Sequence, residues 1–137
     1  MDWKIELLLL PVADVDRAKT FYTDKVGFDL DVDFSPNDEF RVVQMTPPGS
    51  ACSIAVGTGI TDAAPGSVVG VHLIVTDIDA ARAELVERGV EVSDVRHMHD
   101  GEWKPGVHPG HDDYASFADF ADPDGNKWVL QEVGHNP

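Results

Sequence analysis

Residues 7–18 read LLLLPVADVDRA, and residues 70–81 read GVHLIVTDIDAA. In both stretches an apolar run leads into the pattern Asp–apolar–Asp and then into an amphipathic segment. Asp14 and Asp77 stand where a carboxylate accepts hydrogen bonds from the unpaired amides of a helix N-terminus. The glycines that can end the two helices in a left-handed conformation are Gly27 and Gly89. The repeat therefore predicts a strand followed by a helix, twice.

Alternating segments that are typical of strands follow each predicted helix. They lie at residues 28–33, 40–46 and 51–56 in the first half, and at 90–95, 115–121 and 127–133 in the second. The predicted fold is therefore α+β, with two βαβββ modules. We expect one domain of 137 residues, in which module 1 covers about 1–57, a linker about 58–68 and module 2 about 69–134. The second half is longer, and its extra residues lie near 97–113.

The composition limits the classes of partner that the chain can bind and the cell compartment in which we expect it. A net charge of −15 repels nucleic acids and anionic membrane surfaces. The longest apolar run, Leu7–Leu10, is far shorter than the ~20 residues that cross a bilayer. The N-terminus lacks the pattern of a secretory signal, so we expect a cytoplasmic protein. Cys52 is the single cysteine, which excludes an internal disulfide and a zinc site made of several thiolates.

Several motifs resemble those of one protein family. They are Pro11–Ala18, Phe21-Tyr22, Val26-Gly27-Phe28 and the turn DPDGNKW at residues 122–128. Together with the internal repeat, they make the chain similar to the vicinal oxygen chelate (VOC) superfamily, which includes glyoxalase I, extradiol dioxygenases, and fosfomycin and bleomycin resistance proteins. The resemblance implies two βαβββ modules that form a curved mixed sheet around a cavity, often in a homodimer. It also implies enzymes that hold a divalent metal in that cavity, where the ion acts as a Lewis acid.

The positions that the resemblance assigns to metal ligands do not carry ligands here. Counting from the motifs gives Leu7, Ser53, Gly70 and Val129. Zinc, nickel, iron and manganese bind imidazole, carboxylate or thiolate donors, and none of these four residues supplies one. We therefore expect no metal cofactor at the family site. The fallback metal donors elsewhere in the chain are His72, His97 and His99.

His72 is the candidate for chemistry close to these positions. Strand alternation places it on the same face as Gly70, and places Gln131 on the same face as Val129. His72 and Gln131 can then contact an organic ligand, act as an acid/base and hydrogen-bonding pair, or form a weak metal site. The alternative is a histidine without a function. Glu132 has the opposite parity and is expected on the other face.

The extra segment contains four of the six histidines, together with Trp103 and Tyr114 close to its end. One interpretation is a polar surface loop, which its glycines and prolines favour. The other is a lid over the cavity, in which Trp103 and Tyr114 stack on a ligand. The spacing His97-x-His99 places two imidazoles on one side of an extended strand, where they can bind a metal.

Two functional hypotheses follow. In the first, the chain binds a small, largely apolar or aromatic molecule without a metal, as bleomycin resistance proteins of the superfamily do. The ligand-binding residues predicted for it are Leu7, Leu9, Ser53, Gly70, His72, Trp103, Tyr114, Val129 and Gln131. In the second, the chain is a lyase, isomerase or dioxygenase that uses His72 as acid or base, or a shifted divalent-metal site. Both hypotheses imply that the partner is a small molecule. The resemblance to the superfamily also implies a homodimer.

Overall fold

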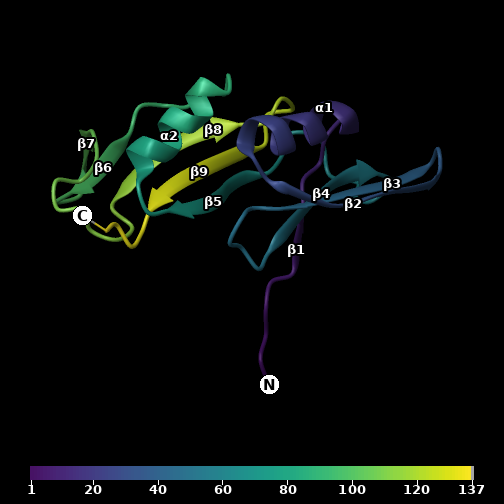
Figure 1. Cartoon of the computed structure of the whole chain (residues 1–137), viewed down its shortest axis with the longest axis horizontal. Coiled ribbons are helices and arrows are strands. Elements are labelled where there is room, and N and C mark those ends of the chain that lie inside the picture. The colour runs from purple at the N-terminus through teal and green to yellow at the C-terminus, as the bar shows by residue number, and fades with distance from the viewer. Residues whose placement is uncertain (137) are drawn as a thin grey trace. The chain divides into compact units, whose positions relative to one another are not determined.

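The computed structural model describes residues 1–136 and divides the chain into two compact units. The first consists of residues 1–68 and 122–126, and the second of residues 69–121 and the chain from Lys127 onward. Each unit contains one mixed β-sheet and helical structure (Figure 1), which confirms the α+β prediction. Within the described residues, no helix is long and apolar enough to cross a membrane.

The first unit has the predicted βαβββ order. Its elements are β1 (Leu7–Leu9), α1 (Val15–Thr20), the π-helix η1 (Phe21–Val26), β2 (Asp29–Asn37), β3 (Phe40–Thr46) and β4 (Ser53–Thr58). The strands lie in the order β1-β4-β3-β2, with β1 parallel to β4 and the other neighbours antiparallel. Asp14 caps α1 as predicted, because its carboxylate accepts a hydrogen bond from Arg17 N at 3.0 Å. Gly27 ends η1 with φ +92°.

The second unit repeats this plan with one more strand. Its elements are β5 (Val69–Val75), α2 (Ile78–Glu87), β6 (Arg96–His99), β7 (Glu102–Pro105), β8 (Ser116–Ala121) and β9 (Lys127–Glu132). The strand order is β5-β9-β8-β6-β7, and β5 is parallel to β9. Asp77 caps α2 through Ala80 N at 3.0 Å. Helix α2 lies along one face of this sheet (Figure 1) and buries Ile78 and Leu85.

The strand predicted at residues 90–95 is wrong. Most of this stretch is irregular, and the strand begins only at Arg96. Arg82 on α2 donates hydrogen bonds to the carbonyl oxygens of Ser93 at 2.8 Å and Val92 at 3.2 Å in this stretch. Ser93 N donates to the carbonyl oxygen of Asp119 at 2.9 Å, and Asp119 N donates to the Ser93 hydroxyl at 2.8 Å, so a side chain takes the place of the backbone acceptor at this position.

The extra segment is only partly a loop. Its first part forms the antiparallel hairpin β6–β7, in which His97 pairs with Lys104 and His99 with Glu102. The expectation that His97 and His99 lie on an extended strand is thus confirmed. In the first unit, the strand predicted at residues 28–33 is longer than expected: β2 continues through Asn37, and the chain reverses at residues 38–39.

The DPDGN turn is bound to the first unit by a buried polar centre. Asp122 accepts hydrogen bonds from the Tyr22 hydroxyl at 2.7 Å, Asp124 N at 3.0 Å, and Asn126 N and Nδ2 at 2.9 and 2.8 Å. Asn126 Nδ2 also donates to the carbonyl oxygen of Pro11 at 2.9 Å. Tyr22 and Asn126 are fully buried. The turn motif and the Phe-Tyr pair therefore serve one hydrogen-bond network, although about 100 residues separate them in sequence.

A charged cluster links α1 to the sheet of the first unit. The carboxylate of Asp33 accepts hydrogen bonds from Arg41 Nε and Nη2, at 3.0 and 2.9 Å, and from Lys19 Nζ at 2.8 Å. These hydrogen bonds, chiefly those from Arg41, hold the pKa of the Asp33 carboxyl well below its usual range.

We expect Asp33→Asn to make stability less dependent on acid pH. Because the pKa of Asp33 is lowered in the folded state, the ionised carboxylate stabilises the protein above its unfolded pKa of about 3.9, and this contribution is lost as the pH falls below it. Urea unfolding between pH 7 and pH 2.5 measures the effect. The free energy of unfolding of the wild type should exceed that of the variant by about 1 kcal/mol near pH 6. This difference should shrink below pH 4. A difference that stays constant with pH would contradict this role.

Candidate functional site

The sheet face of the second unit opposite α2 carries most of the predicted site. Alternate residues of β9 are buried on the helix side, whereas Val129 and Gln131 lie half-buried on the other face. The strand register pairs Val129 with His72 on β5 and with Asp119 on β8, and pairs Gln131 with Phe117. The prediction that His72, Val129 and Gln131 share one face is therefore confirmed.

The alternation that placed Gly70 on this face is interrupted by a β-bulge. Val69 pairs with Lys127 and Val71 with Trp128, so Gly70 is the extra residue and takes φ +91°. Nothing lies within 4 Å of the position that a Cβ on Gly70 would occupy. A side chain here would be strained by the backbone conformation and not by crowding.

A hollow of about 460 Å³ lies beside this bulge. Its lining residues are Val69, Gly70, Asp119, Phe120, Ala121, Lys127, Trp128 and Val129. Five of these eight residues are apolar or aromatic, Gly70 contributes only backbone, and Asp119 and Lys127 supply one carboxylate and one ammonium group. Such a lining suits a small, mainly apolar molecule that carries a few polar groups.

An aromatic and cationic cluster continues from the hollow along the same face. Arg96 binds the Asp119 carboxylate with both terminal nitrogens, at 2.7 and 3.3 Å. Its guanidinium carbon lies 4.8 Å from the centroid of the Trp103 ring and 5.9 Å from that of Phe117. The Trp103 and Phe117 rings meet edge to face at 5.4 Å, and Trp103 is 52% exposed. Trp103 therefore offers an aromatic surface that its neighbours hold in place.

His72 is exposed and has a defined orientation. Its Nδ1 lies 2.7 Å from the carbonyl oxygen of Gly70 and donates a hydrogen bond to it. The ring nitrogen that remains to accept a hydrogen bond, or to bind a proton, is Nε2. Nearby on β9, Gln131 Nε2 donates to the carbonyl oxygen of Tyr114 at 3.3 Å. Tyr114 itself is 60% exposed and has φ +65°.

The remaining predicted residues belong to the first unit. Leu7 pairs with Ser53 between β1 and β4, and Leu9 follows two residues later on β1. Ser53 is buried, and its hydroxyl lies 2.6 Å from the Thr46 hydroxyl, which in turn donates to Asp31. Ser53, Thr46 and Asp31 thus form a short chain of hydrogen-bonded side chains on the sheet of the first unit. That Leu7, Leu9 and Ser53 contact a ligand remains a prediction from the sequence.

Residues 4–130 match the family model of the Glyoxalase/Bleomycin resistance protein/Dioxygenase superfamily. The chain belongs to this superfamily. Among solved structures, it is similar to TnmS3, an antibiotic binding protein from Streptomyces sp. CB03234, at 34% identity and a TM-score of 0.76, over 97% of this chain and 98% of that one. A glyoxalase/bleomycin resistance protein from the same strain is 35% identical, with a TM-score of 0.71 over 93% and 99% of the two chains.

A third similar structure is a member of the superfamily from Sphaerobacter thermophilus DSM 20745. It is 29% identical, with a TM-score of 0.73 over 96% of this chain and 98% of that one. No match was found among curated proteins.

The four positions that the superfamily resemblance assigns to ligands fall into two pairs. Leu7 and Ser53 are register partners in the first unit, and Gly70 and Val129 line the hollow of the second. The structure thus places an apolar side chain or a bare backbone at three of them. Ser53 provides a hydroxyl that is already hydrogen-bonded to Thr46.

The fallback metal donors do not come together in the described part of the chain. His97 is buried and its Nδ1 donates to the carbonyl oxygen of Gly106 at 2.8 Å, whereas His99 is exposed beside Asp100. Within residues 1–136, the one group of three metal-ligating side chains is His111, Glu132 and His135. The sequence analysis considered histidines of the extra segment as metal donors, but it did not predict that Glu132 and His135 lie beside one of them.

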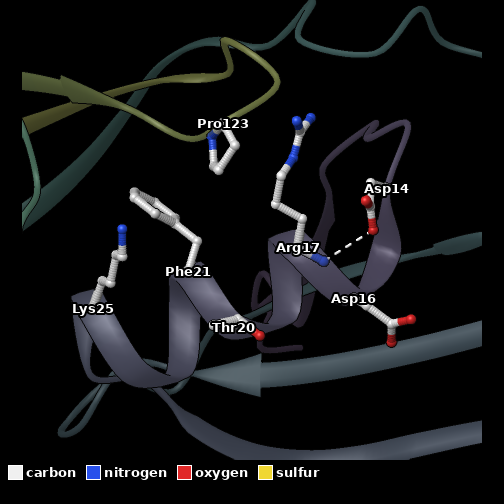
Figure 2. Close-up of a pocket in the computed structure, with 7 residues that line it drawn as sticks. All are labelled: Asp14, Asp16, Arg17, Thr20, Phe21, Lys25 and Pro123. Atoms are coloured by element: carbon white, nitrogen blue, oxygen red, sulfur yellow. Dashed lines mark hydrogen bonds between the residues drawn. The ribbon is translucent and has the colours of Figure 1, made fainter.

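A second hollow, of about 410 Å³, lies in the first unit between the helical segment and the DPDGN turn (Figure 2). Arg17, Phe21 and Lys25 project from one side of the helix toward Pro123. Its polar groups serve the fold: Asp14 caps α1, and Arg17 pairs with Asp124 at 3.1 Å. We therefore place the candidate site on the second unit.

In the aromatic and cationic cluster of that site, sequence reasoning found Trp103 but missed Arg96, Phe117 and Asp119. The signal for two of them was present, since Phe117 and Asp119 alternate with buried residues along β8. Arg96 could not be assigned, because its place depends on where β6 begins.

Proposed function

We propose that the chain binds a small, largely apolar or aromatic molecule on the sheet face of the second unit, without a metal in that site. The observation that carries the proposal is the cluster of Arg96 and Asp119 with Trp103 and Phe117 beside the hollow. A planar ligand can stack on Trp103 while its apolar body fills the hollow. Stacking on an aromatic ring that is already oriented costs little conformational entropy.

Polar groups around the hollow can orient the bound ligand. His72 presents Nε2, and Asp119 and Lys127 provide opposite charges at the margin of the hollow. The similarity to TnmS3, which is described as an antibiotic binding protein, supports a ligand of this kind.

Calorimetric titration with a panel of aromatic antibiotics, bleomycin included, tests the proposal. We expect at least one member to bind with one molecule per chain, and the affinity to stay the same within twofold after treatment with EDTA. Binding that disappears with EDTA and returns with a divalent ion would contradict the metal-free site. A panel without any binding would contradict the ligand class.

A second candidate function is acid/base catalysis by His72. The hydrogen bond from Nδ1 to Gly70 fixes the ring so that Nε2 faces away from that carbonyl, which is the arrangement a general base needs. Turnover of a bound compound with a pH profile that His72→Gln abolishes would favour the enzyme. Binding that His72→Gln weakens, without any turnover in the wild type, would favour the binding protein.

We also propose a cytoplasmic homodimer. Exposed apolar side chains on β5, with Val69 at 72% and Ile74 at 57% exposure, support a contact between copies. Light scattering should then give twice the 14.9 kDa of one chain, and a mass of one chain would contradict the dimer.

A further inference from the structure

Three metal-ligating side chains meet at the end of β9 in the second unit. Glu132 is the last residue of β9, His111 lies in the loop between β7 and β8, and His135 follows three residues after Glu132. One donor atom of each lies within 4.8 Å of the others. By strand alternation, Glu132 lies on the face of β9 opposite Val129 and Gln131, so this group is separate from the proposed ligand site.

The distances are close to those of a coordination sphere. His111 Nδ1 lies 2.7 Å from Glu132 Oε1, and His135 Nδ1 lies 3.9 Å from Glu132 Oε2. Donors bound at ~2.0–2.1 Å to a tetrahedral ion are roughly 3.3 Å apart. These two separations lie on either side of this value. A bound ion lies in the plane of each imidazole, so the two rings, which stack in parallel here, have to turn apart before both Nδ1 atoms reach one ion.

The carboxylate has little access to water. The Glu132 side chain is 1% exposed, whereas those of His111 and His135 are 32% and 19% exposed. Ile78 N donates to Glu132 Oε2 at 3.0 Å. The two imidazole rings stack in parallel, with centroids 3.7 Å apart. A buried carboxylate beside two imidazoles is a set of donors from which an ion has to displace little solvent.

The backbone around the cluster is held in place. Gly134 N donates to Asp113 Oδ1 at 2.8 Å, and Tyr114 N to the carbonyl oxygen of Glu132 at 3.0 Å. His135 Nδ1 also lies 3.0 Å from the carbonyl oxygen of Thr76. His111 has φ +51°, a conformation that residues other than glycine rarely adopt and that is enriched at functional sites.

We propose that His111, Glu132 and His135 bind one divalent transition-metal ion, with Zn²⁺ as the preferred class. Two imidazoles and a carboxylate form a donor set that suits zinc and leaves a fourth position for water or a further ligand. On binding, the proton of each ring moves from Nδ1 to Nε2: His111 exchanges its hydrogen bond to Glu132, and His135 its hydrogen bond to the Thr76 carbonyl oxygen, for a bond from Nδ1 to the ion. The ion ties the 106–115 loop and the C-terminal segment to the end of β9. This inference does not depend on the proposed function.

Titration of the chelator-treated protein with Zn²⁺ in a calorimeter tests the site. We expect one ion per chain, and at least a tenfold loss of affinity in His111→Asn and in His135→Asn. His99→Asn is the matched control, because His99 is exposed and lies outside the cluster, and it should bind as the wild type does. Absence of binding, or binding that both cluster variants retain, would overturn the proposal.

Thermal unfolding guards against variants that fail to fold. Each ion-free variant should unfold cooperatively, and Zn²⁺ should raise the Tm of the wild type and of His99→Asn by several degrees. Neither His111→Asn nor His135→Asn should show this shift. An equal shift in all four proteins would place the ion elsewhere and overturn the assignment.

Discussion

Asp122→Ala should lower the free energy of unfolding by about 3 kcal/mol or more, because it removes the acceptor of four hydrogen bonds at once. Each buried donor that loses its partner costs about 1–3 kcal/mol. The Tyr22 hydroxyl and Asn126 Nδ2 are buried and cannot turn to bulk water. Asn126 Nδ2 keeps its bond to Pro11, which limits the loss there. Urea denaturation of the two proteins measures the difference.

Two further variants distinguish the loss of the Asp122 hydrogen bonds from a general effect of removing a charge. Tyr22→Phe removes one donor together with its bond to Asp122 and should cost about 1 kcal/mol. Asp38→Ala changes an exposed carboxylate in a turn and should cost less than about 0.5 kcal/mol. If Asp122→Ala were no more destabilising than Asp38→Ala, the polar centre would not hold the turn.

Trp103→Ala should raise the Kd for an aromatic ligand by at least tenfold. The variant removes the exposed ring that Arg96 and Phe117 hold in place. Truncation of an aromatic anchor in a binding site commonly costs about 2 kcal/mol, which corresponds to roughly 30-fold in affinity. Calorimetric titration with the tightest antibiotic of the panel measures the change.

Trp3→Ala is the matched control for this prediction. Trp3 is also exposed, at 86%, but it lies in the first unit and outside the cluster. Its removal should leave Kd unchanged within twofold. Equal losses of affinity in the two variants would indicate that the removal of any exposed tryptophan weakens binding. A loss confined to Trp3→Ala would move the site to the first unit.

The helix boundaries could be predicted because their signals are local. Asp14 and Asp77 bond to amides three residues ahead, and Gly27 takes a conformation that other residues rarely adopt. The displaced strand at residues 90–95 had no such signal. The Ser93 hydroxyl accepts a hydrogen bond from Asp119 N, and Arg82 on the preceding helix donates to the Ser93 and Val92 carbonyl oxygens. These contacts depend on how the helix and β8 pack.

The candidate site could be predicted where it depends on alternation along one strand. His72, Val129 and Gln131 share a face as the parity of β5 and β9 requires. The bulge at Gly70 was less accessible, although an isolated glycine inside a strand is itself a signal for one. The cluster around Arg96 depends on the register between β6 and β8, which no short-range pattern specifies.

The most direct test of the binding proposal is the ¹⁵N chemical-shift map of the protein with the tightest antibiotic of the panel. The indole N–H groups of Trp3 and Trp103 report on different units of the chain. We predict that the Trp103 indole and the amides of His72 and Val129 shift most, while the Trp3 indole does not move. Shifts centred on Phe21 and Lys25, at the hollow of the first unit, would contradict the account.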